Sequence, residues 1–157
     1  MIYPFHHIDV RLAPGVAMPQ PATPGSAAVD LCANILDPLF VCPQESAILV
    51  PTGVRIDMTR CPGLCAVILP RSGLGHKGLV LGNGTGLIDN DYHGELLVSL
   101  CNRNHDPDAI ITINPGDRIA QLVFLKTETP FVAMMQVDQF RDATNRGEGG
   151  FGSTGNA

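Results

Sequence analysis

SAILVPTGVRIDM, residues 46–58, decides how this chain folds, because it places two short runs of β-forming residues on either side of a turn signal. The first run, Ser46 to Val50, is followed by Pro51-Thr52-Gly53, and the second run, Val54 to Met58, alternates apolar with polar residues. Alternation with a period of two is typical of a half-buried strand. The stretch therefore predicts two short strands separated by a turn.

The rest of the chain repeats this pattern of short apolar runs between turns. Its 157 residues include 17 Gly and 13 Pro, more than average proteins use. Further strands are expected at residues 64–69, 79–81, 95–100, 109–113, 119–125 and 131–137. No segment keeps a helical period over three turns, and only a short helical turn capped by Ser72 is expected. The pattern predicts an all-β domain built as a sandwich, jelly roll or barrel.

Charge and apolar patterning limit the class of protein. The formal net charge is −5 and the ten Lys and Arg are scattered, so the chain offers no basic surface for a nucleic-acid polymer. No apolar stretch approaches the roughly 20 residues of a membrane span, and the N-terminus lacks a signal-peptide layout. The five Cys form no C-x-x-C pair. We expect a cytoplasmic protein that binds neither nucleic-acid polymers nor membranes.

Two segments differ in composition from the expected β domain. Residues 11–25 contain four Pro and predict an extended surface arm. The glycine-rich end of the chain carries Arg146, Phe151, Ser153 and Thr154. Such a tail either frays in solution or closes over a phosphorylated, aromatic ligand. We expect one domain over residues 1–145 and a flexible arm over residues 146–157.

Residues 81–89 form a glycine-rich stretch between two apolar runs and predict a hairpin. Backbone groups exposed at its tip, with the side-chain amide of Asn83, could read the edge of a planar base. A plain hairpin turn is the alternative interpretation.

Several ionisable side chains follow this stretch, beginning with Asp89. A carboxylate beside a phosphoester can take a proton from water, and the ring of Tyr92 can form a floor for a sugar. An Asx turn with solvated acids explains the same residues, so spacing alone leaves both interpretations open. His93-Gly94-Glu95 matches the H-x-E of zinc deaminases, but the second half of that signature is missing because Cys101 is the last cysteine.

Two further segments suggest phosphate binding. Arg71, Ser72 and Gly73 bring a guanidinium, a hydroxyl and a small residue to the start of the expected helical turn, although a simple capped turn is equally possible. No Walker-type phosphate loop is present. In the run 116–122 the strand alternation sets Gln121 among apolar neighbours, where its amide needs a ligand or a water as partner.

Taken in order, these segments resemble the trimeric deoxyuridine triphosphatase (dUTPase) family, in its bacterial branch. Five motifs carry the resemblance, and together they span nearly the whole chain. They are Ala27-Ala28-Val29-Asp30-Leu31, Pro70-Arg71-Ser72-Gly73-Leu74, the segment Asn83 to Gly94, Gly116-Asp117-Arg118-Ile119-Ala120-Gln121-Leu122, and the segment Arg146 to Gly155.

The resemblance implies hydrolysis of dUTP to dUMP and pyrophosphate, which keeps uracil out of DNA and supplies dUMP for dTMP synthesis. It implies a jelly-roll-like subunit in a homotrimer that exchanges C-terminal arms, with each site built from several chains. Family members bind Mg²⁺ across the phosphates, with Asp30 reaching the metal through water. Alternatives are a dCTP deaminase-like enzyme of the same fold, with one or two activities, and a regulatory protein that binds dUTP without turnover.

The resemblance also assigns roles to individual residues. Asp89 would activate the attacking water, Tyr92 would stack under the sugar, and Asn83 to Gly86 would pair with uracil. The phosphates would be held by Arg71, Ser72, Gly73, Gln121, Arg146, Ser153 and Thr154. Phe151 would close over the base.

Overall fold

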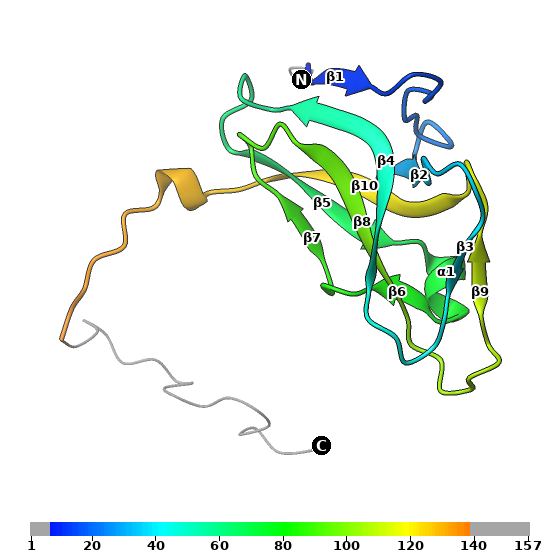
Figure 1. Ribbon diagram of the computed structural model, residues 1–157. Helices are drawn as coiled ribbons and strands as arrows, with labels where there is room; N and C mark the ends of the chain where they lie inside the picture. The colour runs from blue at the N-terminus through cyan, green and yellow to red at the C-terminus, as the bar shows by residue number, and fades with distance from the viewer. Residues whose placement is uncertain (1–6, 139–157) are drawn as a thin grey trace.

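Two four-stranded antiparallel sheets make up most of the computed structural model, which describes residues 7–138 (Figure 1). The first sheet has the order β1 (Asp9–Leu12), β4 (Ile48–Asp57), β8 (Glu95–Asn102) and β6 (Leu79–Leu81). The second has the order β2 (Val29–Cys32), β10 (Arg118–Lys126), β5 (Leu64–Pro70) and β7 (Gly86–Ile88). A third, two-stranded sheet pairs β3 (Leu39–Val41) with β9 (Ile111–Ile113). The predicted all-β class is confirmed.

Helical structure in the described part of the chain is limited to two short pieces, α1 (Ser72–His76) and the 3₁₀ turn η1 (Thr129–Phe131). The predicted cap is wrong, because Arg71 occupies the position before α1 and no side chain caps the helix. None of the helices within residues 7–138 has the length and apolarity that a membrane crossing requires.

One hydrophobic core joins the facing sides of the two large sheets. Alternate residues of β8, among them Leu96 and Leu100, are at most 1% exposed and belong to the same cluster as Ile68 of β5 and Leu122 of β10. Burying one such side chain contributes about 1.5–3 kcal/mol. This packing fixes the strands whose ends carry the candidate site.

The outer face of the second sheet is also apolar. Register pairs set Leu87 opposite Val67, Val67 opposite Val123, and Cys65 opposite Leu125, so these side chains share one face. Leu87 is 64% exposed and Leu125 is 45% exposed. Exposed side chains of this size in one apolar row are typical of a surface that another protein covers.

The predicted turn at Pro51 to Gly53 is wrong. These residues lie inside β4, where the pairing with β8 shifts register between Pro51 and Arg55. The bulge accommodates the missing N–H of Pro51, and Gly53 adopts a positive φ of 69°. Thr52 Oγ1 donates to the Leu96 carbonyl at 2.7 Å, which compensates for part of the interrupted ladder.

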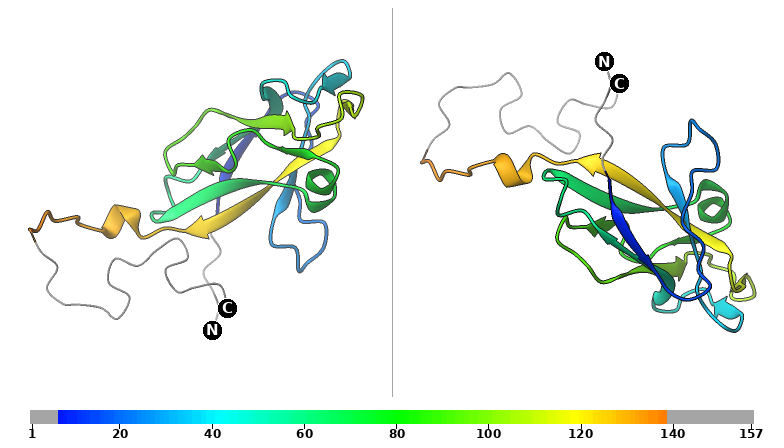
Figure 2. Two further views of the ribbon diagram at one scale, coloured as in Figure 1. Left: turned by 90° about the horizontal axis from the view of Figure 1, so that it is seen from below. Right: turned by 90° about the horizontal axis from the view of Figure 1, so that it is seen from above.

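The predicted hairpin over residues 81–89 is also wrong. Strand β6 pairs with β8 in the first sheet, whereas β7 pairs with β5 in the second. Residues 82–85 therefore connect the two sheets and do not join paired strands. The predicted strand at 131–137 is wrong as well, since residues 132–137 form neither helix nor strand and Met134 is 92% exposed. This segment extends away from the sheets (orange in Figure 2).

The other five predicted strands correspond to β5, β6, β8, β9 and β10, with ends that differ by a few residues. Strands β1, β2, β3 and β7 were not predicted. Strand β1 includes the first two residues of the expected surface arm, and from Ala13 the chain runs outside the large sheets, with one isolated bridge from Pro21 to Val29.

Candidate active site

Residues 89–93, which we name the acidic turn, follow directly after β7. The last residue of β7, Ile88, pairs with Ala66 of β5, and the Tyr92 N–H donates to the Asp89 carbonyl at 3.2 Å. The Asp89 carboxylate is exposed and lines a pocket of about 430 Å³ together with Asn90 and Asp91. The turn thus presents a solvent-accessible carboxylate on a closed backbone loop.

Asn90 ties the acidic turn to the connection between β4 and β5. Its Nδ2 lies within hydrogen-bond distance of three carbonyl oxygens, those of Met58 at 2.6 Å, Cys61 at 3.0 Å and Leu64 at 3.2 Å. The amide shares its two hydrogens among these acceptors. The residue next to Asp89 is therefore fixed by its own side chain.

Tyr92 is held in one orientation by its neighbours. Its hydroxyl donates to the Glu95 carbonyl at 3.0 Å, and a Cβ added at Gly94 would collide with the ring. Only glycine fits under the ring at this position. Tyr92 remains 42% exposed, so a ligand can reach this residue.

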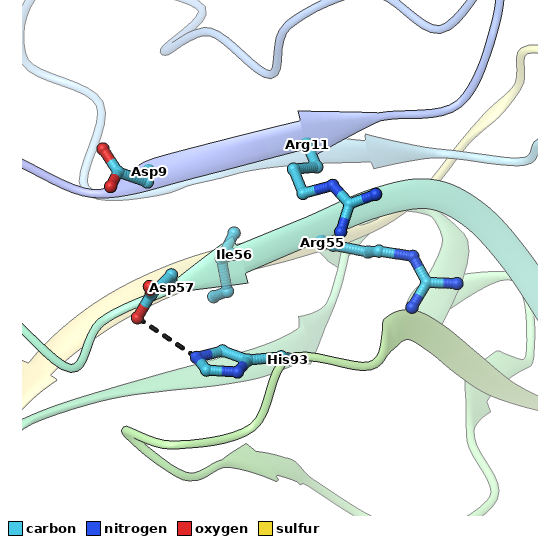
Figure 3. A pocket seen from close by; sticks show the side chains of 6 residues that line it. All are labelled: Asp9, Arg11, Arg55, Ile56, Asp57 and His93. Carbon is cyan, nitrogen blue, oxygen red and sulfur yellow. Dashed lines mark ion pairs between the residues drawn. The ribbon is translucent and has the colours of Figure 1, made fainter.

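His93 leaves the acidic turn toward β4, where its Nε2 lies 3.2 Å from Asp57 Oδ1 (Figure 3). Thr59 donates to the same carboxylate oxygen from its hydroxyl at 2.7 Å and its N–H at 2.9 Å. These two bonds, with a smaller effect of His93, lower the pKa of Asp57 to about 2. Glu95 Oε1 instead accepts from the Gly53 N–H at 2.7 Å, so the H-x-E residues do not converge.

A second cluster, which we name the cationic pocket, is formed by Asp30, Arg71, Ser72, Arg118 and Gln121 around a cavity of about 300 Å³. Arg71 Nε donates to Asp30 Oδ1 at 2.8 Å, and an Arg118 guanidinium nitrogen lies 3.2 Å from Asp30 Oδ2. Two cations face one carboxylate. The surplus positive charge suits a polyanionic ligand.

Gln121 is satisfied within the chain, since its Nε2 donates to the Pro70 carbonyl at 3.0 Å. The sequence predicted that a ligand or a water would be the partner of this amide. In the structure, the partner of its nitrogen is a backbone carbonyl. The alternation predicted around Gln121 is interrupted, because a register shift between Arg118 and Ala120 buries both Ile119 and Ala120.

Ser72 and Gly73 stand exposed at the start of α1. A Cβ added at Gly73 would meet no atom within 4 Å, so the chain itself does not require glycine there. Asn83 is exposed in the connection between the sheets, and its carbonyl accepts from the Thr85 N–H at 2.8 Å. A Cβ at Gly86 would lie 3.1 Å from the Cβ of Ile68, a tight contact.

Residues 7–138 contain no cluster of three or more His, Cys, Asp or Glu side chains that could hold a metal ion alone. The carboxylate of the cationic pocket, Asp30, is already bound by two guanidinium groups. Mg²⁺ in nucleotide enzymes keeps several waters and takes few protein carboxylates besides substrate phosphates. The donor set therefore fits an ion that arrives with phosphates and meets Asp30 through water.

The structure brings the sequence-predicted residues together as two groups and not as one. The acidic turn lies near the Cys65 end of β5, whereas Arg71 follows the other end of that strand. At a rise of about 3.3 Å per residue, the two groups lie roughly 20 Å apart along β5. The expected site residues Arg146, Phe151, Ser153 and Thr154 lie outside the described residues.

Three contributors to these groups were missed by sequence reasoning, namely Arg118, Asn90 and His93. Arg118 contacts a residue 88 positions earlier, a separation that no local pattern encodes. Asn90 could have been found from its position next to Asp89, and His93 was considered only as part of a zinc-deaminase signature.

Sequence comparison extends over nearly the whole chain. Residues 15–155 match the dUTPase family. The deoxyuridine 5′-triphosphate nucleotidohydrolase of Aeromonas salmonicida (strain A449) is 50% identical over 149 residues, which cover 94% of this chain and 93% of that protein.

Two similar solved structures come from phages of Staphylococcus. The dUTPase of Staphylococcus bacteriophage 80alpha, solved with dUpNHpp, has a TM-score of 0.84 at 28% identity and covers 96% of this chain and 99% of its own. A mutant dUTPase from phage phi11 of S. aureus, described with a coordinated structural Mg(II) ion, has a TM-score of 0.73 at 26% identity. Its match covers 87% of this chain and 99% of that one.

Proposed function

This chain belongs to the dUTPase family and hydrolyses dUTP, and we propose that Asp89 activates the attacking water at a site shared between subunits. The Asp89 carboxylate accepts a proton from water, whose oxygen bonds to the α-phosphorus. The bond from that phosphorus to the bridging oxygen breaks, and pyrophosphate leaves. A general base of this kind contributes about 10²–10⁴-fold to the rate.

The fixed backbone around Asp89 supports this role, because Ile88 before it and Asn90 after it are both held by β5 or its flanks. Tyr92 stacks under the deoxyribose and leaves no room for a 2′-hydroxyl. Asn83 and Gly86 present the connection between the sheets to uracil. Tyr92, Asn83 and Gly86 all lie within six residues of Asp89 in the sequence.

The cationic pocket holds the phosphates through Arg71, Ser72, Gly73 and Gln121. Arg118 adds a second guanidinium and keeps Asp30 oriented from the other side. Mg²⁺ bound by the phosphates would neutralise their charge, and Asp30 would meet its hydration shell. The open space beside Gly73 leaves room for a phosphate oxygen close to the backbone.

The separation of the two groups supports a shared site. A base must come within about 2.6–3.2 Å of the water it deprotonates, yet the cationic pocket of the same chain lies roughly 20 Å from the acidic turn. One chain cannot supply both groups to one triphosphate. We propose that the acidic turn of one subunit and the cationic pocket of another form each site in a jelly-roll homotrimer.

Two exposed apolar surfaces support this assembly. The outer face of the second sheet carries Leu87 and Leu125, and the segment after η1 carries Val132 and Met134, which are 58% and 92% exposed. A β-type run that pairs with no strand in the described part of its own chain is suited to pairing with a second copy. The arm that follows would bring Arg146, Ser153 and Thr154 to the γ-phosphate and Phe151 over uracil.

The observation that carries this proposal is the exposed Asp89 carboxylate on a turn closed over Tyr92. The purified protein should release pyrophosphate and dUMP from dUTP, and Mg²⁺ should raise the rate. It should release no ammonia from dCTP. Ammonia from dCTP would identify a deaminase and refute the proposal, and tight dUTP binding without pyrophosphate would identify a regulatory protein.

A further inference from the structure

The acidic turn is bonded near each of its ends to a different segment. One segment is β4, and the other is the connection that follows β4. Near its start, Asn90 Nδ2 reaches three carbonyl oxygens between Met58 and Leu64. At its end, His93 Nε2 reaches Asp57 Oδ1. Asp89 and Tyr92, the two residues of the turn with proposed chemical roles, stand beside these ties.

We propose that Asn90 and His93 are positioning residues for dUTP hydrolysis, which act by clamping the acidic turn against residues 57–64. The inference rests on the proposed role of Asp89. Asn90 sets the backbone from which the Asp89 carboxylate projects, and His93 sets the backbone that carries the Tyr92 ring. Neither side chain touches the reacting atoms.

The Asn90 tie reaches into an already folded connection. The Met58 carbonyl also accepts from the Cys61 N–H at 2.8 Å, and the Cys61 carbonyl accepts from the Leu64 N–H at 3.0 Å. The carbonyls that close these two consecutive turns therefore also accept from the side-chain amide of Asn90. Met58 is fully buried and Leu64 is 6% exposed, so this connection is anchored in the core. Through Asn90, the residue next to Asp89 is therefore bonded to a segment that the core holds in place.

The His93 tie lies at the surface, where the His93 and Asp57 side chains are 60% and 37% exposed. Asp57 is held by Thr59, and its pKa of about 2 keeps it ionised. The other charged groups that line the same pocket are Asp9, Arg11 and Arg55. Figure 3 shows both arginine side chains beyond Ile56, away from the contact between His93 and Asp57.

The geometry predicts different kinetic effects for the two ties. Loss of the Asn90 amide shifts the base relative to the α-phosphorus, and a displacement of about 1 Å at a reacting group costs on the order of 10²-fold in rate. Loss of His93 loosens the ring under the sugar instead. The first change lowers kcat, whereas the second raises KM.

The test compares steady-state dUTP hydrolysis by the full-length wild type and by Asn90→Ala, Asn90→Ser, His93→Ala and His93→Gln. Asn90→Ala should lower kcat by about 10–100-fold with KM within about threefold of wild type. Asn90→Ser keeps a shorter donor and should recover part of kcat. His93→Ala should raise KM several-fold, and His93→Gln, which keeps a donor, should restore it.

Asn104→Ala is the matched control, because Asn104 Nδ2 also donates to a backbone carbonyl, that of Lys77 at 3.0 Å, but far from the acidic turn in the chain. Thermal unfolding of every variant reports the structural part of each effect. If Asn90→Ala and Asn104→Ala lose stability alike and both keep wild-type kcat, the positioning role is refuted. His93 is exposed, so its variants test the clamp even if Asn90→Ala does not fold.

Asp89→Asn assayed in parallel separates this inference from the proposed function. If Asp89→Asn retains wild-type turnover, the base assignment fails and the clamp fails with it. If Asp89→Asn is inactive while the Asn90 and His93 variants hydrolyse dUTP normally, the clamp alone is refuted. A double-mutant cycle of Asp57→Ala with His93→Ala should be non-additive in KM, since each substitution removes the same contact.

Discussion

The acidic turn and the cationic pocket differ in what each contains. Among the described residues, the pocket beside Asp89 is lined by Asp91 and polar or apolar side chains but by no Lys or Arg. The cationic pocket has Arg71 and Arg118 around a single carboxylate, Asp30. One region can accept a proton and the other can hold phosphates.

Each region is fixed by its own chain, and each lacks the groups of the other. The acidic turn is held by Asn90 and Tyr92, and Asp30 is held by Arg71 and Arg118. Their separation of roughly 20 Å along β5 is the reason for proposing that each site combines the two regions from different copies of the chain. Chemistry then depends on how a second copy is placed, which is the central claim of the proposed mechanism.

The largest effect is expected from removing the base on the acidic turn. Asp89→Asn should lower kcat by about 10³-fold while the affinity for a non-hydrolysable dUTP analogue changes little, because a general base acts in the transition state. Steady-state kinetics and titration calorimetry measure the two quantities. If Asp91→Asn abolished turnover and Asp89→Asn did not, the roles of the two acids would be reversed.

A smaller effect is expected from removing the C-terminal arm, which tests whether the two regions suffice. Truncation after Asn145 should reduce kcat/KM by about 10²-fold, a loss of about 2.7 kcal/mol, which one or two charged hydrogen bonds to phosphate supply at about 1.5–3 kcal/mol each. Thermal unfolding should not change, since the core cluster lies between Leu31 and Leu122.

Removal of residues 155–157 alone is the matched control for the arm and should leave the kinetics at wild-type values. Normal hydrolysis by the longer truncation would contradict the role of Arg146, Ser153 and Thr154. It would leave the acidic turn and the cationic pocket as the whole site.

The smallest effect is expected on the stability of the fold in acid, through the Asp57 carboxyl that His93 contacts. The pKa of this carboxyl is about 2 in the folded chain against about 3.9 when unfolded, so the unfolded chain binds more protons between these values. Its contribution to stability is complete above about pH 4 and is lost as the pH falls toward 2. Asp57→Asn should flatten this part of the acid dependence of the urea midpoint. An unchanged slope between pH 4 and 2 would contradict the assignment.

Sequence patterns predicted β5, β6, β8, β9 and β10, because short apolar runs between turn residues are typical of strands that pack against a core. They failed where a tertiary contact replaces a local rule. Pro51 and Gly53 signal a turn, yet a bulge lets β4 continue through them. The glycines of residues 82–86 signal a hairpin, yet the flanking strands find partners in different sheets.

For the candidate site, the order of motifs predicted a set of residues but not their grouping. Nothing in the spacing of Arg71 and Asp30, 41 positions apart, states that they form an ion pair. Asn90 looked like part of a solvated turn because its three acceptors come from a connection about 30 residues earlier. The run 131–137 has a β pattern and pairs with no strand among residues 7–138, and in the proposed assembly it would pair with a second copy.

The most direct test of the shared site is subunit complementation. Asp89→Asn and Arg71→Gln, each inactive alone, should regain activity when mixed in equal amounts, unfolded and refolded together. With random assembly, about a quarter of the sites combine an intact acidic turn with an intact cationic pocket from different subunits, so about a quarter of wild-type activity is expected. Activity no higher than that of the separately refolded variants would contradict the account and place the whole site within one chain.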